Sequence, residues 1–130
     1  MTNSPGELFR NRLAVSYHQV ALFDAQTRGA YPQWKTGHET VVVGTHGVAV
    51  AVAPDVEVVV QKGTDAPPGF DLCVSAEITV EAEGVIVGNV PSAVTSNLNW
   101  PKGKTTVVIY VNGLNGTASQ VYFCLAPYEA

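Results

Sequence analysis

The chain has 130 residues, of which 46% are hydrophobic and 14% charged, and its formal net charge is −4. This length and apolar content fit one folded domain and exclude an intrinsically disordered chain. The excess of acidic residues excludes the basic surface that direct binding of DNA or RNA needs, and no apolar run approaches the ~20 residues of a transmembrane helix. Residues 1–12 lack the basic start and apolar block of a secretory signal, so we expect a cytoplasmic protein.

Short runs of Val, Thr, Ile and Tyr, separated by Gly, Pro and Asn, favour strands over helices along the whole chain. Residues 1–12 are expected to form a flexible N-terminal arm, and residues 13–130 the folded domain. The first strand is predicted over residues 13–24. Further strands are predicted over residues 40–43, 48–53, 56–62, 72–80, 85–90, 104–111 and 120–125.

Turn residues support these boundaries. Residues 44–47 separate two Val-rich runs, and Glu83-Gly84 separates two alternating runs, so a hairpin corner is predicted at each. Pro101 and Gly103 fit a type I turn that begins the strand at residue 104, and residues 112–116 return the chain so that the last two strands form a hairpin. About eight such strands predict an all-β, single-domain antiparallel β-sandwich.

Two segments do not fit the strand pattern. Residues 63–69 contain Pro67 and Pro68 in succession and are predicted to be a loop. Residues 26–39 have no clean period; their Tyr31 and Trp34 are expected near one end of the core.

The cysteines and histidines form no recognisable metal site. Cys73 and Cys124 lie in apolar strand-like runs and are expected to be buried, with a disulfide between them left open only for an oxidising compartment. His18, His38 and His46 lack the spacing of zinc ligands. We therefore predict neither a metal nor another cofactor.

No motif for nucleophilic catalysis is present, and Gly-x-Ser-x-Gly in particular is missing from the sequence. Glu81 and Glu83 would project from the same face of a strand, but such pairs are common on solvent-exposed faces. The sequence therefore predicts a binding protein rather than an enzyme. An enzyme assembled around His18 or around the Glu81 and Glu83 pair stays as a third hypothesis.

Acidic residues are concentrated between positions 55 and 83, where Lys62 is the one base. They either form a solvated outer face or an acidic surface that binds a basic partner. The seven acidic residues of this segment are Asp55, Glu57, Asp65, Asp71, Glu77, Glu81 and Glu83.

Three segments of the sequence are similar to one known family. Val-Ser-Tyr-His-Gln-Val-Ala-Leu-Phe, from residue 15, resembles the Ile-Ser-Tyr-His-Gln-Phe strand near the start of the competence protein J family. Residues 76–87 resemble a strand, a Glu-Asn-Gly turn and a second strand of that family, and residues 98–103 resemble its Leu-Pro-Lys-Gly corner. The three segments occur in the same order, and the resemblance covers most of the chain, from about residue 13 to 126.

The resemblance implies a protein that performs no chemistry and blocks a nuclease by forming a complex with it, as an inhibitor of the nuclease that acts when DNA enters the cell or as an immunity protein for a nuclease toxin. A basic nuclease would then be the partner, and acidic and aromatic side chains would make the contacts. The candidate contact residues are Asp55, Glu57, Asp65, Asp71, Glu81, Glu83, Trp34 and Trp100.

The main alternative is a small-ligand or carbohydrate-binding sandwich that uses Trp34 or Trp100 as a stacking platform. For either tryptophan to act at a binding surface it has to be exposed, and packing in the core is the competing expectation. The sequence also leaves a homodimer open.

Overall fold

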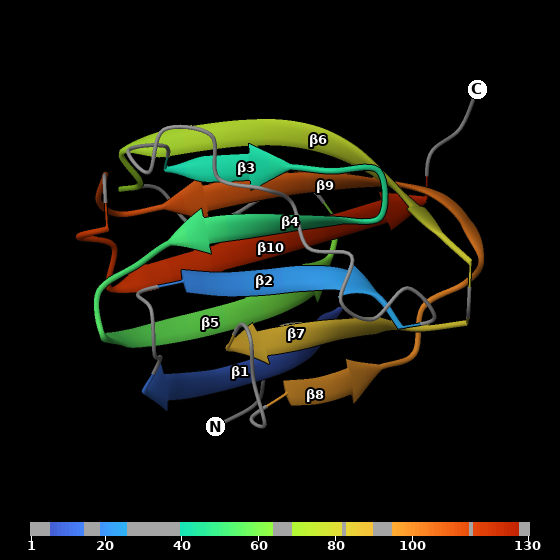
Figure 1. Ribbon diagram of the computed structural model, residues 1–130, viewed down its shortest axis with the longest axis horizontal. Helices are drawn as coiled ribbons and strands as arrows, with labels where there is room; N and C mark the ends of the chain where they lie inside the picture. Colours follow the sequence, from blue (N-terminus) through green and yellow to red (C-terminus); the bar gives the residue numbers. More distant parts are fainter. Residues whose placement is uncertain are drawn as a thin grey trace.

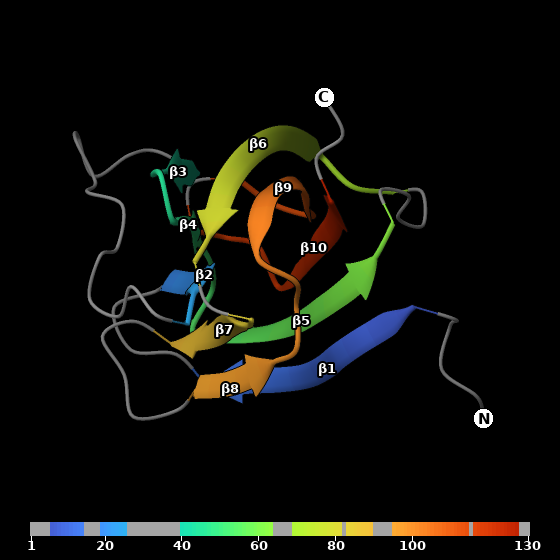
Figure 2. The same ribbon diagram turned by 90° about the vertical axis from the view of Figure 1, so that its right-hand side faces the viewer.

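The computed structural model describes residues 6–14, 19–25, 40–63, 69–81, 83–89, 95–114 and 116–127. Within these residues, ten strands form two five-stranded sheets that pack face to face (Figures 1 and 2). The predicted all-β sandwich is confirmed, with ten strands in place of eight. In the part of the chain that the structure describes, no helix is long and apolar enough to span a membrane.

We call the two sheets A and B, and each contains five strands in the following spatial order. Sheet A consists of β1 (Glu7–Ala14), β5 (Asp55–Lys62), β10 (Gln120–Pro127), β9 (Gly103–Val111) and β6 (Leu72–Val80). Sheet B consists of β3 (Val41–Val43), β4 (Gly47–Ala51), β2 (Gln19–Asp24), β7 (Val85–Asn89) and β8 (Thr95–Leu98). Neighbouring strands are antiparallel, except that β5 and β10 are parallel.

The N-terminal part of the chain differs from its predicted form. The run expected as one strand over residues 13–24 contributes to two strands in different sheets, since β1 ends at Ala14 and β2 begins at Gln19. Residues 7–12, expected in a flexible arm, lie in β1 and pair with β5. The inward side chains of Phe9 and Leu13 pack on the core and hold this strand in place.

Two predicted hairpins are confirmed, and a third is wrong. The β3–β4 and β9–β10 pairs are antiparallel hairpins, as expected from their turn residues. The corner at Glu83 and Gly84 is no hairpin, because it connects β6 of sheet A to β7 of sheet B. Val80 and Val85 both belong to the core between the sheets, so the chain crosses from one layer to the other at this point.

The core fills the space between the two sheets with the inward side chains of both. Val58 of β5, Ile109 of β9 and Phe123 of β10 are fully buried there. Trp100 is also part of this core, with 5% of its surface exposed, and its Nε1 donates a hydrogen bond to Thr105 Oγ1 at 2.7 Å. That bond satisfies the one polar group of the indole, so the ring can be buried at little cost.

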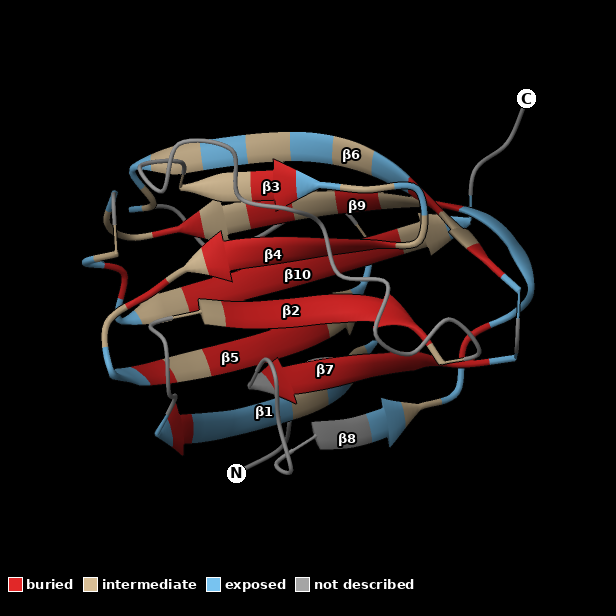
Figure 3. Ribbon diagram, viewed as in Figure 1, coloured by how far each residue is buried: buried red, intermediate tan, exposed pale blue. Residues whose placement is uncertain are grey.

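The two sheets differ in how far their strands are buried: Figure 3 shows β2, β4 and β7 of sheet B buried along most of their length, whereas β1 and β6 of sheet A are mostly exposed or intermediate. The outer face of sheet B carries the small apolar cluster of Ala21, Phe23, Ala49 and Ile86, which is buried. At Gly47 of β4 a Cβ atom would lie 2.5 Å from Phe23 Cβ, so only glycine permits this close approach. In sheet A, strands β1 and β6 alternate between exposed and more buried residues, so its outer face meets solvent.

Candidate functional site

The outer face of sheet A is the exposed surface on which we locate the candidate site. Side chains alternate across a sheet, so residues paired across neighbouring strands share a face. One row crosses the whole sheet from Arg10 through Val59, Tyr122 and Tyr110 to Cys73. This face therefore combines polar, charged and aromatic side chains.

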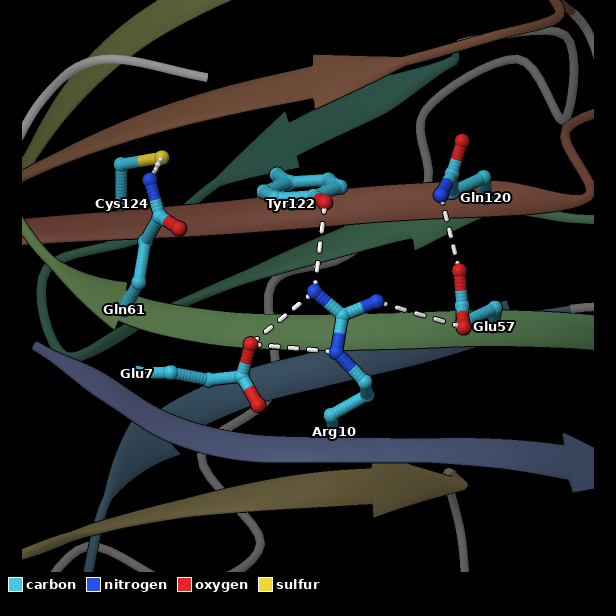
Figure 4. A network of polar contacts seen from close by, with 7 residues as sticks. All are labelled: Glu7, Arg10, Glu57, Gln61, Gln120, Tyr122 and Cys124. Carbon is cyan, nitrogen blue, oxygen red and sulfur yellow. Dashed lines mark hydrogen bonds and ion pairs between the residues drawn. The ribbon is translucent and has the colours of Figure 1, made fainter. Parts of the chain in front are cut away.

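A network of polar contacts centres on Arg10 of β1 (Figure 4). Arg10 donates to Glu7 Oε1 through Nε at 3.0 Å and through Nη2 at 2.9 Å. Its Nη2 also donates to the Tyr122 hydroxyl at 3.5 Å, and its Nη1 to Glu57 Oε2 at 3.4 Å. Gln120 Nε2 donates to the other oxygen of Glu57 at 2.8 Å, so a second residue of β10 joins the network beside Tyr122. The bonds to Glu7 and then to Tyr122 raise the pKa of Arg10, so its charge is permanent at any physiological pH.

An irregularity in β1 brings Glu7 and Arg10 together. Residues three apart on a regular strand point to opposite faces. The register of β1 shifts between Glu7 and Phe9, so Glu7 pairs with Gln61 while Arg10 pairs with Val59. A one-residue bulge of this kind reverses the alternation, which places both charged side chains on the outer face.

Removal of the Arg10 side chain has a predictable cost. The side chain of Glu7 is 4% exposed and that of Arg10 39%, so Arg10→Met would leave a buried carboxylate without its partner. We expect a loss of about 2 kcal/mol in the free energy of unfolding, below the ~3–5 kcal/mol of a fully buried pair because Arg10 is partly solvated. Urea unfolding measures this loss.

The matched control for this prediction is the double variant Glu7→Gln/Arg10→Met. It removes the orphaned charge and is expected to recover most of the lost stability. Equal losses in the single and double variants would contradict the proposed coupling.

An aromatic cluster lies beside the Arg10 network on the same face. The ring of Phe70 packs on Tyr110 with centroids 5.9 Å apart, and against the edge of Tyr122 at 5.2 Å. The partly exposed rings of Phe70 and Tyr110 pack against three buried side chains, those of Val59, Tyr122 and Cys124. The cluster connects the segment before β6 to the centre of the sheet.

The two cysteines do not both occupy the expected environment. Cys124 is buried, as predicted, and its Sγ accepts a hydrogen bond from Gln61 Nε2 at 3.4 Å (Figure 4). The prediction that Cys73 is buried is wrong, since it lies exposed on the outer face of the edge strand β6. Neither cysteine takes part in a disulfide.

The acidic segment does not fold into one patch. Strands β5 and β6 run in the same direction in sheet A, but β10 and β9 lie between them. Asp55, Glu57 and Asp71 therefore lie toward one end of the sheet, and Glu81 and Glu83 follow the opposite end of β6. The first three thus share one end of the sheet, with Asp71 separated from Asp55 and Glu57 by the width of β10 and β9, and the last two lie at the other end.

Nearby bases offset several of these charges. Asp55 pairs with Arg12 at 3.3 Å, and Glu77 pairs with Lys104 at 3.8 Å. Both pairs are largely exposed, so each contributes little to stability. The outer face of sheet A is consequently a surface of mixed charge.

The remaining candidates fall into two groups. Trp100 is buried in the core, which rules it out as an exposed aromatic anchor or as a stacking platform for a carbohydrate. Asp65, Trp34 and His18 lie outside the described residues. Among the residues that the structure does describe, no group of three or more His, Cys, Asp or Glu side chains is arranged to hold a metal ion.

Comparisons with known proteins give matches in structure alone. No family model matches the sequence, and no curated protein matches it. The solved structure of ComJ from Bacillus subtilis, an inhibitor of the DNA-degrading activity of NucA, aligns with a TM-score of 0.75 and 11% identity, over 94% of this chain and 97% of ComJ. The protein of crocagin biosynthetic gene J aligns with a TM-score of 0.62 and 11% identity, over 92% of this chain and 96% of its own. The chain therefore has the fold of ComJ, in agreement with the family resemblance of its three sequence segments.

Proposed function

We propose that this chain is a protein inhibitor that binds a nuclease and blocks its action on DNA. The observation that carries this proposal is the structural similarity to ComJ over nearly the full length of both chains. The protein of crocagin biosynthetic gene J has the same fold, but its name refers to biosynthesis and not to a nuclease. The fold by itself therefore does not determine the function. The sequence resemblance to the competence protein J family adds independent support.

We assign the contact with the nuclease to the outer face of sheet A. The apolar outer cluster of sheet B is already buried, whereas the outer face of sheet A presents partly exposed Tyr110 and Phe70 among hydrogen-bonding side chains. Stable interfaces commonly have aromatic anchors within a polar rim and bury ~1,600 Å² in total.

A basic partner would meet this face at its more acidic end. Asp55, Glu57 and Asp71 lie there, and we propose them as the charged contacts. Glu81 and Glu83 belong to a second, separate part of the surface, and Asp65 and Trp34 stay predictions. Complementary charges of this kind mainly accelerate association and select the partner.

We propose that the chain performs no chemistry of its own and acts in the cytoplasm, beside the nuclease that it restrains. An immunity protein for a nuclease toxin would act in the same way, by occupying its partner.

The test is an inhibition assay with the nuclease encoded nearest to this chain in the genome. We expect degradation of linear DNA to stop near a one-to-one ratio of chain to nuclease, and we expect a complex of the summed mass in size-exclusion chromatography with light scattering. Inhibition should weaken as salt is raised, because part of the attraction is electrostatic. An unrelated nuclease serves as the control; unchanged cleavage by the neighbouring nuclease, without a complex, would contradict the proposal.

A further inference from the structure

Strand β6 is an edge strand of sheet A, and a turn from the other sheet covers part of its free edge. Among the described strands, β6 pairs with β9 only. Thr79 of β6 directs its backbone away from β9: its N–H donates to Thr45 O at 2.8 Å, and its carbonyl oxygen lies 2.9 Å from His46 Nδ1. Thr45 and His46 belong to the turn that joins β3 and β4 of sheet B.

These two contacts reproduce what a neighbouring strand would offer. In an antiparallel ladder, a hydrogen-bonded residue finds on the neighbouring strand one acceptor for its N–H and one donor for its carbonyl oxygen. Thr45 supplies the acceptor through its carbonyl, and His46 supplies the donor through its ring. Because a carbonyl oxygen can only accept, His46 must carry a proton on Nδ1.

The fold holds the turn in this position. Gly44 N–H donates to Gly47 O at 2.8 Å, which closes the turn tightly. In Figure 2, β6 arches over the sandwich toward β3 and β4, so the edge of sheet A approaches the hairpin of sheet B.

The remainder of the β6 edge shows why a cap is useful. Alternate residues of a strand direct their backbone groups to the same side, so Cys73, Ser75 and Glu77 face the same edge as Thr79. Such an edge is a template for pairing with a strand of another molecule, and natural proteins block it with charges, bulges or a covering loop. Glu77 is exposed and charged, and the β3–β4 turn covers the next position along.

We propose that the β3–β4 turn is an edge cap, which closes the sandwich at β6 and prevents strand addition by a second copy of the chain. The opposite edge of sheet A has its own protection. In β1 the Arg12 N–H is bonded to Asn11 Oδ1 at 2.9 Å, and the bulge between Glu7 and Phe9 interrupts the ladder. With the cap at β6, both edges of sheet A would be protected against pairing with another chain.

Two substitutions of similar size at one position test the cap. His46→Asn retains an N–H donor at the same distance from the backbone as Nδ1, whereas His46→Asp places a carboxylate oxygen against the Thr79 carbonyl. We expect the Asp variant to increase the hydrogen-exchange rate of the Thr79 amide about tenfold and to dimerise with rising concentration. The Asn variant should exchange and sediment like the parent chain.

Hydrogen exchange followed by NMR and sedimentation velocity provide the two measurements. An Asp variant that stays monomeric at the highest soluble concentration would overturn the proposed block on strand addition. If His46→Asp does not fold, His46→Ala removes the donor without adding a charge. Dimerisation of this variant would then support the proposed cap, and a variant that stays monomeric would overturn it.

Discussion

Phe123→Ala is expected to lower the free energy of unfolding by about 3–5 kcal/mol, enough to unfold many single domains. Phe123 is fully buried in β10, where it is paired with Val60 of β5 and Ile109 of β9. Its ring fills the middle of the core, so alanine would leave a cavity that the two rigid sheets cannot close. Urea unfolding followed by circular dichroism measures the change.

Leu114→Ala is the control for this prediction. Leu114 is 46% exposed in the turn between β9 and β10, so its truncation should change stability by less than ~0.5 kcal/mol. Comparable losses in the two variants would show that Phe123 does not occupy the core position described here.

Tyr110→Ala is expected to weaken inhibition of the nuclease about 30-fold, the loss typical of an aromatic residue at the centre of an interface. Tyr110 lies on the outer face of sheet A, on the strand beside the central β10 and toward the end of the sheet where Glu57 and Asp71 lie, and Phe70 packs on its ring. A ring that is already ordered loses little entropy on binding, so its contacts contribute more to affinity. The inhibitory concentration in the DNA degradation assay is the measurement.

A matched control separates the proposed surface from the proposed function. Val43→Ala alters an exposed apolar side chain on β3 of sheet B, outside the proposed contact, and should leave inhibition unchanged. Unfolding curves of both variants confirm that the chains are folded. If Tyr110→Ala inhibits as well as the parent chain, the outer face of sheet A is not the contact surface, while inhibition by another face would still stand.

Strand prediction succeeded where side chains alternate clearly. Strand β6 has its predicted bounds, since small or apolar residues alternate with polar ones from Leu72 to Val80. Strand β8, with the sequence Thr-Ser-Asn-Leu, was missed because it carries almost no apolar signal. The part of β1 before residue 13 was not predicted. The polar run Arg10, Asn11 and Arg12 separates its two inward residues, Phe9 and Leu13, so no alternating pattern is visible in the sequence.

The candidate site was harder to predict than the fold, since it depends on strand order. The acidic residues are close in sequence, but two strands from the C-terminal half lie between β5 and β6 and divide them. The Arg10 network was missed because strict alternation places Glu7 and Arg10 on opposite faces, and only the bulge reverses this. A bulge in an edge strand leaves no distinctive mark in a single sequence.

The parallel pairing of β5 with β10 also constrains how the chain is made. Residues 120–127 supply the middle strand of sheet A, between β5 and β9. During translation, β5 is therefore without this neighbour until the ribosome has released the last of these residues, some sixty positions later. Until then the Val-rich β5 has an unsatisfied side, so folding of sheet A is delayed until residues 120–127 have been made, and a nascent chain halted before residue 120 is prone to aggregate.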